Sequence, residues 1–469
     1  MRDENDDYGS EKDVKILLDK YELMLKQNEQ YFFDVYEFEE LINCYIDEKR
    51  NITKALQVCI LAIGQHPYSV VFLIRQAQLY GSLNNIHKAM ESISKAELME
   101  PSNPELFLTR GGIYSQMHEY DKAIESYHLA LEITDDKDEV YMNIAFEYEN
   151  KNDYKKAIHY LKRALEENHE NEYALFELAF CFDADGNIKE SIEFYNGFLN
   201  DHPYSHSAWY NLGIAYNKSG DFQKAIDAYD YAIVIQDEFS SAYFNKGNSL
   251  ANIGLFNVAI ETYRKTFEFE SADAVTYYYI GECFEKMEKY EDALINYNRA
   301  IKTDAELADG WIGVGVVLDC LERTIEAVHY IKKGIELESS NADYLYILGD
   351  IQQKLGFYDE AEDSYRKGVE MDPTNIEVWL ELSQMLYSQG NIQLAIVTIA
   401  ESIKYVPDAV ELYYQMAGLK YLEGKNQEAS EYMEKALGLD FSKHEIIYEL
   451  SSSLKENTFI NTLIEQYRK

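Results

Sequence analysis

The stretch WYNLGIAYNKSGDFQKAI, residues 209–226, decides the fold. It places the large aromatic Trp209 four residues before Gly213, and a Ser-Gly turn signal then precedes Ala225. Apolar residues three and four apart on both sides of that turn predict two helices joined as a hairpin. Gly213 and Ala225 have the small side chains that let two helix axes approach closely.

The alanine of this stretch recurs every 34 residues, with no insertion across twelve units. The residues at this position are Ala55, Ala89, Ala123, Ala157, Ser191, Ala225, Ala259, Ala293, Ala327, Ala361, Ala395 and Ala429. Chance does not keep one phase over so many units, so the chain is a tandem repeat. Ser191 is the single residue of this set that is not alanine.

Other positions of the repeat have an equally constant character when Tyr36 is taken as the first residue of the first unit. Position 4 is bulky and holds all three tryptophans, position 8 is small, position 24 is often tyrosine, and position 32 holds five of the six prolines. This pattern resembles the tetratricopeptide repeat family. The resemblance implies an all-α fold, a right-handed α-solenoid (superhelix) of tandem 34-residue antiparallel helix hairpins.

The register divides the chain into four parts. We expect an acidic disordered N-terminus over 1–11, an N-terminal capping helix and linker over 12–35, and twelve repeat units over 36–443. Residues 444–469 have the apolar spacing of C-terminal capping helices, one over HEIIYELSSSLK and a short one over TFINTLIEQYRK.

The formal net charge of −41 restricts the classes of partner. Phosphate backbones and anionic membranes are repelled by such a field, so we expect no nucleic acid and no membrane partner. Neutral or basic protein segments are attracted, although the same charge also serves the solubility of a long helical surface. Oligomeric state cannot be read from these features.

No pattern of catalytic or metal-binding residues stands out. The sequence has no phosphate-binding glycine loop, no HExxH, no GxSxG and no CxxC. His202 and His206 are four residues apart but flank Pro203 at a unit boundary, so they do not share a helical face. We therefore expect no enzyme, no cofactor and no metal. Unpaired cysteines and the lack of an apolar leader favour the cytoplasm.

In the tetratricopeptide family the first helices of successive units line a concave face with unit positions 2, 5, 6, 9, 12 and 13, which share one side of a helix. On this resemblance the expected partner-binding residues are Asn143, Tyr210, Asn211, Phe244, Asn245, Asn248, Tyr278 and Tyr346. Aromatic residues supply contact area there, and amides pair with an extended backbone. Asn211 and Asn245 are expected to face solvent in the free protein.

The asparagines at position 6 resemble the ladder of the O-linked N-acetylglucosamine transferase repeats, but only Asn143, Asn211 and Asn245 match it. They are equally well explained as ordinary polar residues of an exposed face. The leading hypothesis is a protein-protein interaction scaffold that binds a partner polypeptide segment on the concave face. The alternative is a regulatory subunit that docks on a folded enzyme or secretion component through its convex face.

Overall fold

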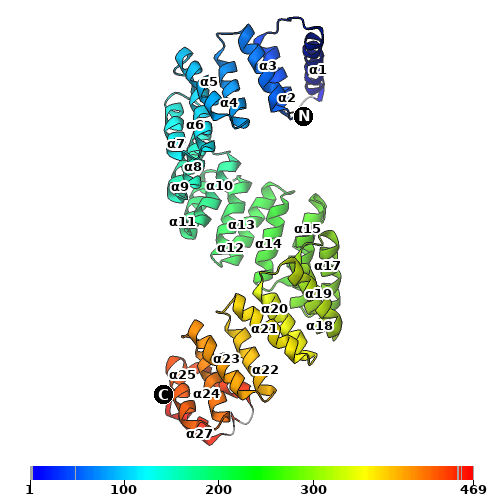
Figure 1. The fold of residues 1–469 in the computed structure, drawn as a ribbon, viewed down its shortest axis with the longest axis vertical. Coiled ribbons are helices and arrows are strands. Elements are labelled where there is room, and N and C mark those ends of the chain that lie inside the picture. The colour runs from blue at the N-terminus through cyan, green and yellow to red at the C-terminus, as the bar shows by residue number, and fades with distance from the viewer. Residues whose placement is uncertain (1–3, 48, 452–453, 456, 468–469) are drawn as a thin grey trace. The chain divides into compact units, whose positions relative to one another are not determined.

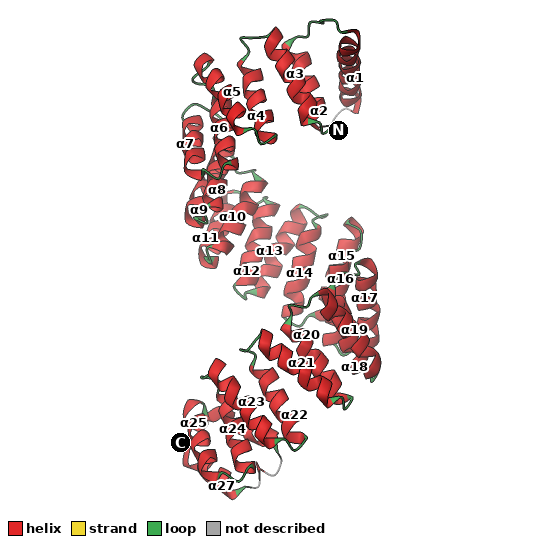
Figure 2. Ribbon diagram, viewed as in Figure 1, coloured by secondary structure: helices red, strands yellow, loops and turns green. Residues whose placement is uncertain are grey.

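A computed structural model describes residues 4–47, 49–451, 454–455 and 457–467, and for residues 4–13 it describes the backbone alone. Throughout these residues the regular structure is helical, with no strand (Figure 2). The helices pack into two units, residues 1–237 and 238–469. The predicted all-α architecture of tandem helix hairpins is confirmed within each unit.

Helix bounds follow the repeat. Unit 1 contains α1 (Glu4–Gln27), α2 (Val35–Asp47), α3 (Ile52–Gln65), α4 (Val70–Ser82), α5 (Ile86–Met99), α6 (Pro104–Gln116), α7 (Tyr120–Leu131), α8 (Lys137–Asn150), α9 (Tyr154–Glu167), α10 (Glu172–Ala184), α11 (Ile188–Asp201), α12 (His206–Lys218) and α13 (Phe222–Ile235) (Figure 1). Unit 2 contains α14 (Ser240–Asn252), α15 (Phe256–Phe269), α16 (Ala274–Lys286), α17 (Tyr290–Thr303), α18 (Ala308–Cys320), α19 (Thr324–Leu337), α20 (Ala342–Lys354), α21 (Tyr358–Met371), α22 (Ile376–Ser388), α23 (Ile392–Tyr405), α24 (Val410–Leu422), α25 (Asn426–Leu439), the 3-10 helix η1 (Phe441–Ile446), α26 (Ile447–Leu450) and α27 (Thr458–Tyr467). From α2 onward, even-numbered helices are the first and odd-numbered helices the second of each hairpin, up to α25.

The two helices of a hairpin are held together by a ring laid across a glycine. In α12 and α13, a Cβ added to Gly213 would lie 2.4 Å from a ring carbon of Tyr229. The same contact joins Gly247 to Tyr263 in unit 2, at 2.5 Å. Both tyrosines are almost fully buried. In these hairpins position 8 is glycine because the tyrosine ring at position 24 occupies the place of a side chain.

Each first helix ends at a residue in the left-handed region. After Asn28, which follows α1, the positive φ angles fall 34 residues apart: Arg50, Asn84, His118, Asn152, Gly186, Gly220, Gly254, Glu288, Glu322, Gly356, Gly390 and Gly424. At Gly220 (φ 81°) the next amide, that of Asp221, donates to the carbonyl of Tyr216 at 2.9 Å, which closes the helix end. Half of these turns thus use a residue other than glycine.

The large aromatics at position 4 fasten the loops between hairpins. The indole N–H of Trp209 donates to the carbonyl of Pro203 at 2.9 Å, and that of Trp379 to Pro373 at 3.0 Å. Trp311 makes the same bond to Ala305. Each bond satisfies a carbonyl six residues earlier, in the loop before the helix.

The two ends of the chain differ from expectation. Helix α1 begins at Glu4, so residues 4–11, expected to be disordered, are helical; acidic residues suit the N-terminal end of a helix dipole. Residues 1–3 of that segment lie outside the described residues. Further along α1, Tyr21 and Met24 are buried, and Tyr21 packs edge-on against Phe33 and Tyr45.

At the C-terminus, the single helix expected over HEIIYELSSSLK is instead η1 followed by the one-turn helix α26. Asp440 explains the change, because its carboxylate accepts from the amide of Ser442 and starts a tight turn ahead of the expected helix. Ile447 and Leu450 of α26 pack into the last hairpin, and α27 adds Ile460 and Ile464. Residues 452–453, 456 and 468–469 lie outside the described residues.

The glycine–tyrosine contact gives a stability prediction. Gly213→Ala should lower the free energy of unfolding by about 1 to 3 kcal/mol, because the new methyl overlaps the Tyr229 ring. Gly197→Ala is the matched control: it lies in helix α11 with open space around its Cβ position, and should raise stability by roughly 0.5 to 1 kcal/mol. Urea unfolding of both variants measures the difference, and a stabilising Gly213→Ala contradicts the packing described.

Candidate functional site

A groove runs across the first helices α4, α6 and α8 of unit 1. Its volume is about 350 Å³. The lining residues are Gln78, Gly81, Ser82, Glu105, Leu108, Thr109, Gly112, Ile113, Gln116, Tyr127, Glu139 and Asn143. All but Tyr127 come from first helices, and most occupy the unit positions that the sequence assigned to a binding wall. We call this set of residues the α4–α8 groove.

Hydrogen bonds between side chains link the helices beside the groove. Arg75 donates to Asn43 on α2 at 3.0 Å and to Gln78 at 3.1 Å. The amide nitrogen of Gln78 donates onward to Glu105 at 2.9 Å and to Thr109 at 3.1 Å. These bonds hold the polar side chains in place, so the groove is preorganised for polar contacts.

The floor of the groove is open at Gly112. A Cβ added there would meet no atom within 4 Å, whereas one at Gly81 would lie 3.3 Å from the side-chain oxygen of Gln116. Glu105 and Glu139 are exposed at the groove, and its lining contains no Lys or Arg. The groove therefore offers amide, hydroxyl and carboxylate groups around an accessible stretch of helix, and its charge is negative.

A partly buried carboxylate lies farther along the same row of first helices. Glu149 of α8 accepts a hydrogen bond from the Cys181 thiol of α10 at 3.3 Å. The pKa of Glu149 is raised from 4.5 to about 6, mainly by burial; the hydrogen bond from the Cys181 thiol lowers it and the nearby Glu177 carboxylate raises it. Its charge therefore changes close to neutral pH.

The structure places three of the expected binding residues in unit 1. Asn143 lies in the α4–α8 groove and is half-buried. Tyr210 of α12 is half-buried, with its ring edge-on to Phe176 at 6.1 Å and tilted to Tyr229 at 5.9 Å. Asn211 was expected to face solvent, but it is buried.

Asn211 is only 1% exposed, and its amide nitrogen donates to the carbonyl of Leu175 on α10 at 3.1 Å. Tyr195 donates to the same carbonyl at 2.7 Å. The expectation of exposure was wrong because α10 and α12 lie close enough for the short Asn211 side chain to reach across. Asn211 therefore supports the packing between hairpins.

The other five expected residues belong to unit 2. Phe244 of α14 and Tyr278 of α16 both contact the ring of Tyr279, each at 5.4 Å. Asn248 accepts a short hydrogen bond from Tyr263 at 2.6 Å, so its amide oxygen is already engaged within the hairpin. Asn211 and Asn248 are thus both bonded within the protein, so fewer amides remain for the ladder that was expected to pair with a ligand backbone.

Asn245 and Tyr346 are half-buried, like Phe244, Asn248 and Tyr278. Tyr346 lies on α20, where its hydroxyl donates to Glu377 at 3.3 Å and its ring contacts Tyr365 at 6.2 Å. Phe244, Tyr278 and Tyr279 form a row of aromatic rings across α14 and α16. Their role in partner binding remains a prediction.

Carboxylates accompany the aromatic row. Tyr297 donates to Glu285 at 2.6 Å. Burial raises the pKa of Glu282, and the carboxylates of Glu285 and Asp309 add to the rise while Lys286 opposes it. Both units therefore carry acidic groups next to their first-helix binding positions.

Sequence reasoning passed over several groove residues. The sequence analysis did not select Gln116, Thr109 and Gly112, although they occupy positions 13, 6 and 9 of the third repeat. The unit position alone was enough to predict Gln116 and Thr109. Gly112 has no side chain that could indicate binding, and its role depends on the open space that the neighbouring helices leave beside it.

Within the described residues, no cluster of three or more His, Cys, Asp and Glu side chains has the geometry of a metal site. Across the same residues, no helix combines the length and apolar character needed to span a bilayer.

Models of the tetratricopeptide repeat match residues 72–103, 111–141, 151–212, 206–239, 240–272, 276–306, 342–375 and 410–443. A search among curated proteins found no significant match.

Solved structures with similar helical arrays include MamA, with 25% identity and a TM-score of 0.32 over 34% of this chain and 94% of that one. YrrB, described as a tetratricopeptide protein with an unusual peptide-binding site, has 16% identity and a TM-score of 0.33 over 42% and 97%. The Cut9–Hcn1 hetero-tetramer of APC/C has 14% identity and a TM-score of 0.43 over 82% and 96%.

The burial of Asn211 gives a prediction opposite to that for an exposed residue. Asn211→Ala should lower the free energy of unfolding by about 1 to 3 kcal/mol, because a buried hydrogen bond to the Leu175 carbonyl is lost. Asn143→Ala, at the same unit position but half-buried in the groove, should change stability by less than about 0.5 kcal/mol. Thermal unfolding of the pair checks this, and equal melting temperatures contradict it.

The raised pKa of Glu149 gives a pH-dependent prediction. Folding disfavours its charged form, so this group's contribution to stability is present below about pH 4.5 and lost as the pH rises through about 6. Glu149→Gln should therefore stabilise the protein above neutral pH, by at most about 2 kcal/mol, and give little gain in acid. Glu125→Gln, which removes an exposed charge from α7, is the control for net charge. A stabilisation independent of pH speaks against burial as the cause.

Proposed function

Because this chain belongs to the tetratricopeptide repeat family, we propose that it works as a protein-interaction scaffold. The first helices of successive hairpins form one surface, the first-helix wall, and this surface binds a neutral or basic segment of a partner polypeptide. The observation that carries the proposal is the α4–α8 groove, which is lined by the repeat positions assigned to binding and contains no cation. We further propose that the protein is not an enzyme and acts in the cytoplasm. Its five cysteines are free thiols, four of them buried, which suits a reducing compartment.

The groove suits an extended segment for physical reasons. An extended backbone presents N–H and C=O groups in alternation, and the Gln116 and Asn143 amides can each donate and accept. Glu105 and Glu139 attract Lys or Arg side chains, and the exposed helix surface at Gly112 lets the segment approach closely. The row of Phe244, Tyr278 and Tyr279 in unit 2 offers aromatic faces beside carboxylates, which also favours cationic side chains.

In the alternative, a folded partner docks on the convex face. This alternative needs affinity to depend on the second helices, such as α5 and α7. Charges can be removed separately from first and second helices of neighbouring hairpins, so one experiment shows which kind of helix a charged segment binds.

We predict that a fluorescent peptide of repeated Gly-Ser-Lys binds the wild-type protein more tightly than its Gly-Ser-Glu counterpart. The double variant Glu105→Gln and Glu139→Gln should weaken Gly-Ser-Lys binding by about three- to tenfold at low salt, because two groove charges are lost. The difference should shrink at about 0.15 M salt through screening. Fluorescence anisotropy measures both dissociation constants.

The matched control is Glu91→Gln with Glu125→Gln, which removes the same charge from α5 and α7. It should leave peptide affinity nearly unchanged. If this control weakens binding as much as the groove variant, attraction is a property of the whole surface and the groove is not the site. If only the control weakens binding, the peptide binds on the second helices and the first-helix proposal is wrong.

A further inference from the structure

The exposed face of α10 in unit 1 is aromatic, although the solvated face of a helix is ordinarily polar. Tyr173 is 55% exposed, Phe176 38% and Phe180 53%. They occupy unit positions 2, 5 and 9, and no other repeat has aromatic residues at all three positions. Phe146, at position 9 of α8, is 46% exposed. We call these four residues the α8–α10 aromatic face, and exposed rings gathered in this way mark a binding surface.

The α8–α10 aromatic face continues the α4–α8 groove. Asn143 of the groove lies about one helical turn before Phe146 on α8, so the two side chains share one side of the helix. The hydrogen bond from the Cys181 thiol to Glu149 joins α8 to α10 beside the rings. A segment that leaves the groove across α8 therefore meets the rings of α10 next.

Two carboxylates lie beside these rings. Partial burial raises the pKa of the Tyr173 hydroxyl, and the nearby carboxylates of Glu177 and Glu149 raise it further, so the three groups are neighbours. Neither helix supplies a cation to them. Helix α10 has no Lys or Arg, and the lysine of α8, Lys137, is the first residue of that helix.

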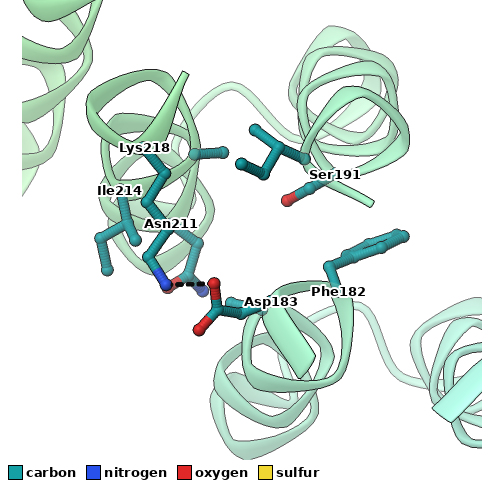
Figure 3. A pocket seen from close by; sticks show the side chains of 9 residues that line it. Phe182, Asp183, Ser191, Asn211, Ile214 and Lys218 are labelled. Atoms are coloured by element: carbon teal, nitrogen blue, oxygen red, sulfur yellow. Dashed lines mark ion pairs between the residues drawn. The ribbon is translucent and has the colours of Figure 1, made fainter. Parts of the chain in front are cut away.

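The nearest carboxylate at the end of α10 already has a cationic partner. Asp183 is ion-paired with Lys218 of α12, as the dashed line in Figure 3 shows. Within the part of the chain that the structure describes, Glu149 and Glu177 form no such ion pair. The α8–α10 aromatic face therefore combines exposed rings with negative charge that the protein itself does not neutralise.

We propose that the α8–α10 aromatic face binds arginine side chains of the partner segment. A guanidinium group is planar, so it stacks on a phenylalanine ring while its N–H groups donate to a neighbouring carboxylate. A lysine ammonium group is more strongly hydrated and cannot stack in this way. An apolar side chain would cover Glu149 and Glu177 without compensating their charge. The inference rests on the proposed function, because it names the cation preferred in the segment that the first-helix wall binds.

Three fluorescent peptides of equal length, built from repeated Gly-Ser-Arg, Gly-Ser-Lys and Gly-Ser-Leu, test the preference by anisotropy. The wild-type protein should bind the arginine peptide about three- to tenfold more tightly than the lysine peptide, because stacking is added to an equal charge. The leucine peptide should bind more weakly than both, since it has no charge to attract.

Phe176→Leu combined with Phe180→Leu is the decisive variant, because leucine keeps an apolar side chain and removes the ring. Its preference for arginine over lysine should fall to less than about twofold, with little change in affinity for the lysine peptide. The matched control is Phe32→Leu with Phe357→Leu, which removes two exposed rings elsewhere in the chain and should keep the wild-type preference.

A signal from the site itself makes the test independent of these variants. With 4-fluorophenylalanine in place of Phe180, the fluorine NMR resonance should move when the arginine peptide binds, and should move less with the lysine peptide at equal saturation. The same label in place of Phe357 should not move with either peptide.

Equal affinities for the arginine and lysine peptides, an unchanged preference in the Phe176 and Phe180 variant, or an unmoved fluorine resonance at position 180 would each overturn the inference. Tightest binding of the leucine peptide would also overturn it, because the occupant would then be apolar. Under any of these results, a preference for Gly-Ser-Lys over Gly-Ser-Glu that depends on Glu105 and Glu139 still supports the scaffold function, so the two proposals fail separately.

Discussion

The whole structure depends on how closely two helices approach within a hairpin. A tyrosine ring lies directly over a glycine backbone in the hairpins of Gly213 and Gly247, and no side chain larger than hydrogen fits between them without movement. This contact fixes the spacing of the two helices and hence the surface they present to the next hairpin. The same contact joins Gly111 to Tyr127, Gly281 to Tyr297 and Gly349 to Tyr365, so it recurs in both units. Each hairpin buries its apolar face only against its neighbours, so the helix spacing set in one hairpin affects the next.

The sequence was sufficient to predict the hairpins, because their determinants are local and repeated. A small residue at position 8, an alanine at position 20 and a turn between them recur with one period, so chance variation in a single unit does not hide the pattern. The ends of the chain were predicted less well. There a single segment decides, as when Asp440 starts a tight turn where apolar spacing indicated a longer helix.

Binding residues were harder to predict than core residues. The helical face was chosen from unit position, and Asn143 lies in the α4–α8 groove, where its role in binding stays a prediction. Position could not show that Asn211 reaches the Leu175 carbonyl of another hairpin, or that Asn248 is held by Tyr263. Both contacts depend on distances between helices, and the spacing of residues within one helix does not give these distances. The two asparagines share a face with Asn143 but have different partners.

The buried tyrosines that hold several hairpins together also differ from exposed tyrosines in how they ionise. Burial raises the phenol pKa of Tyr195, Tyr229 and Tyr263 well above the ordinary value for tyrosine. In alkaline solution the exposed rings ionise first, and a buried ring gives the ultraviolet band of phenolate only after its hairpin opens. The rise in phenolate absorbance in alkaline solution therefore reports how many buried tyrosines have become accessible as the hairpins open, without an added label.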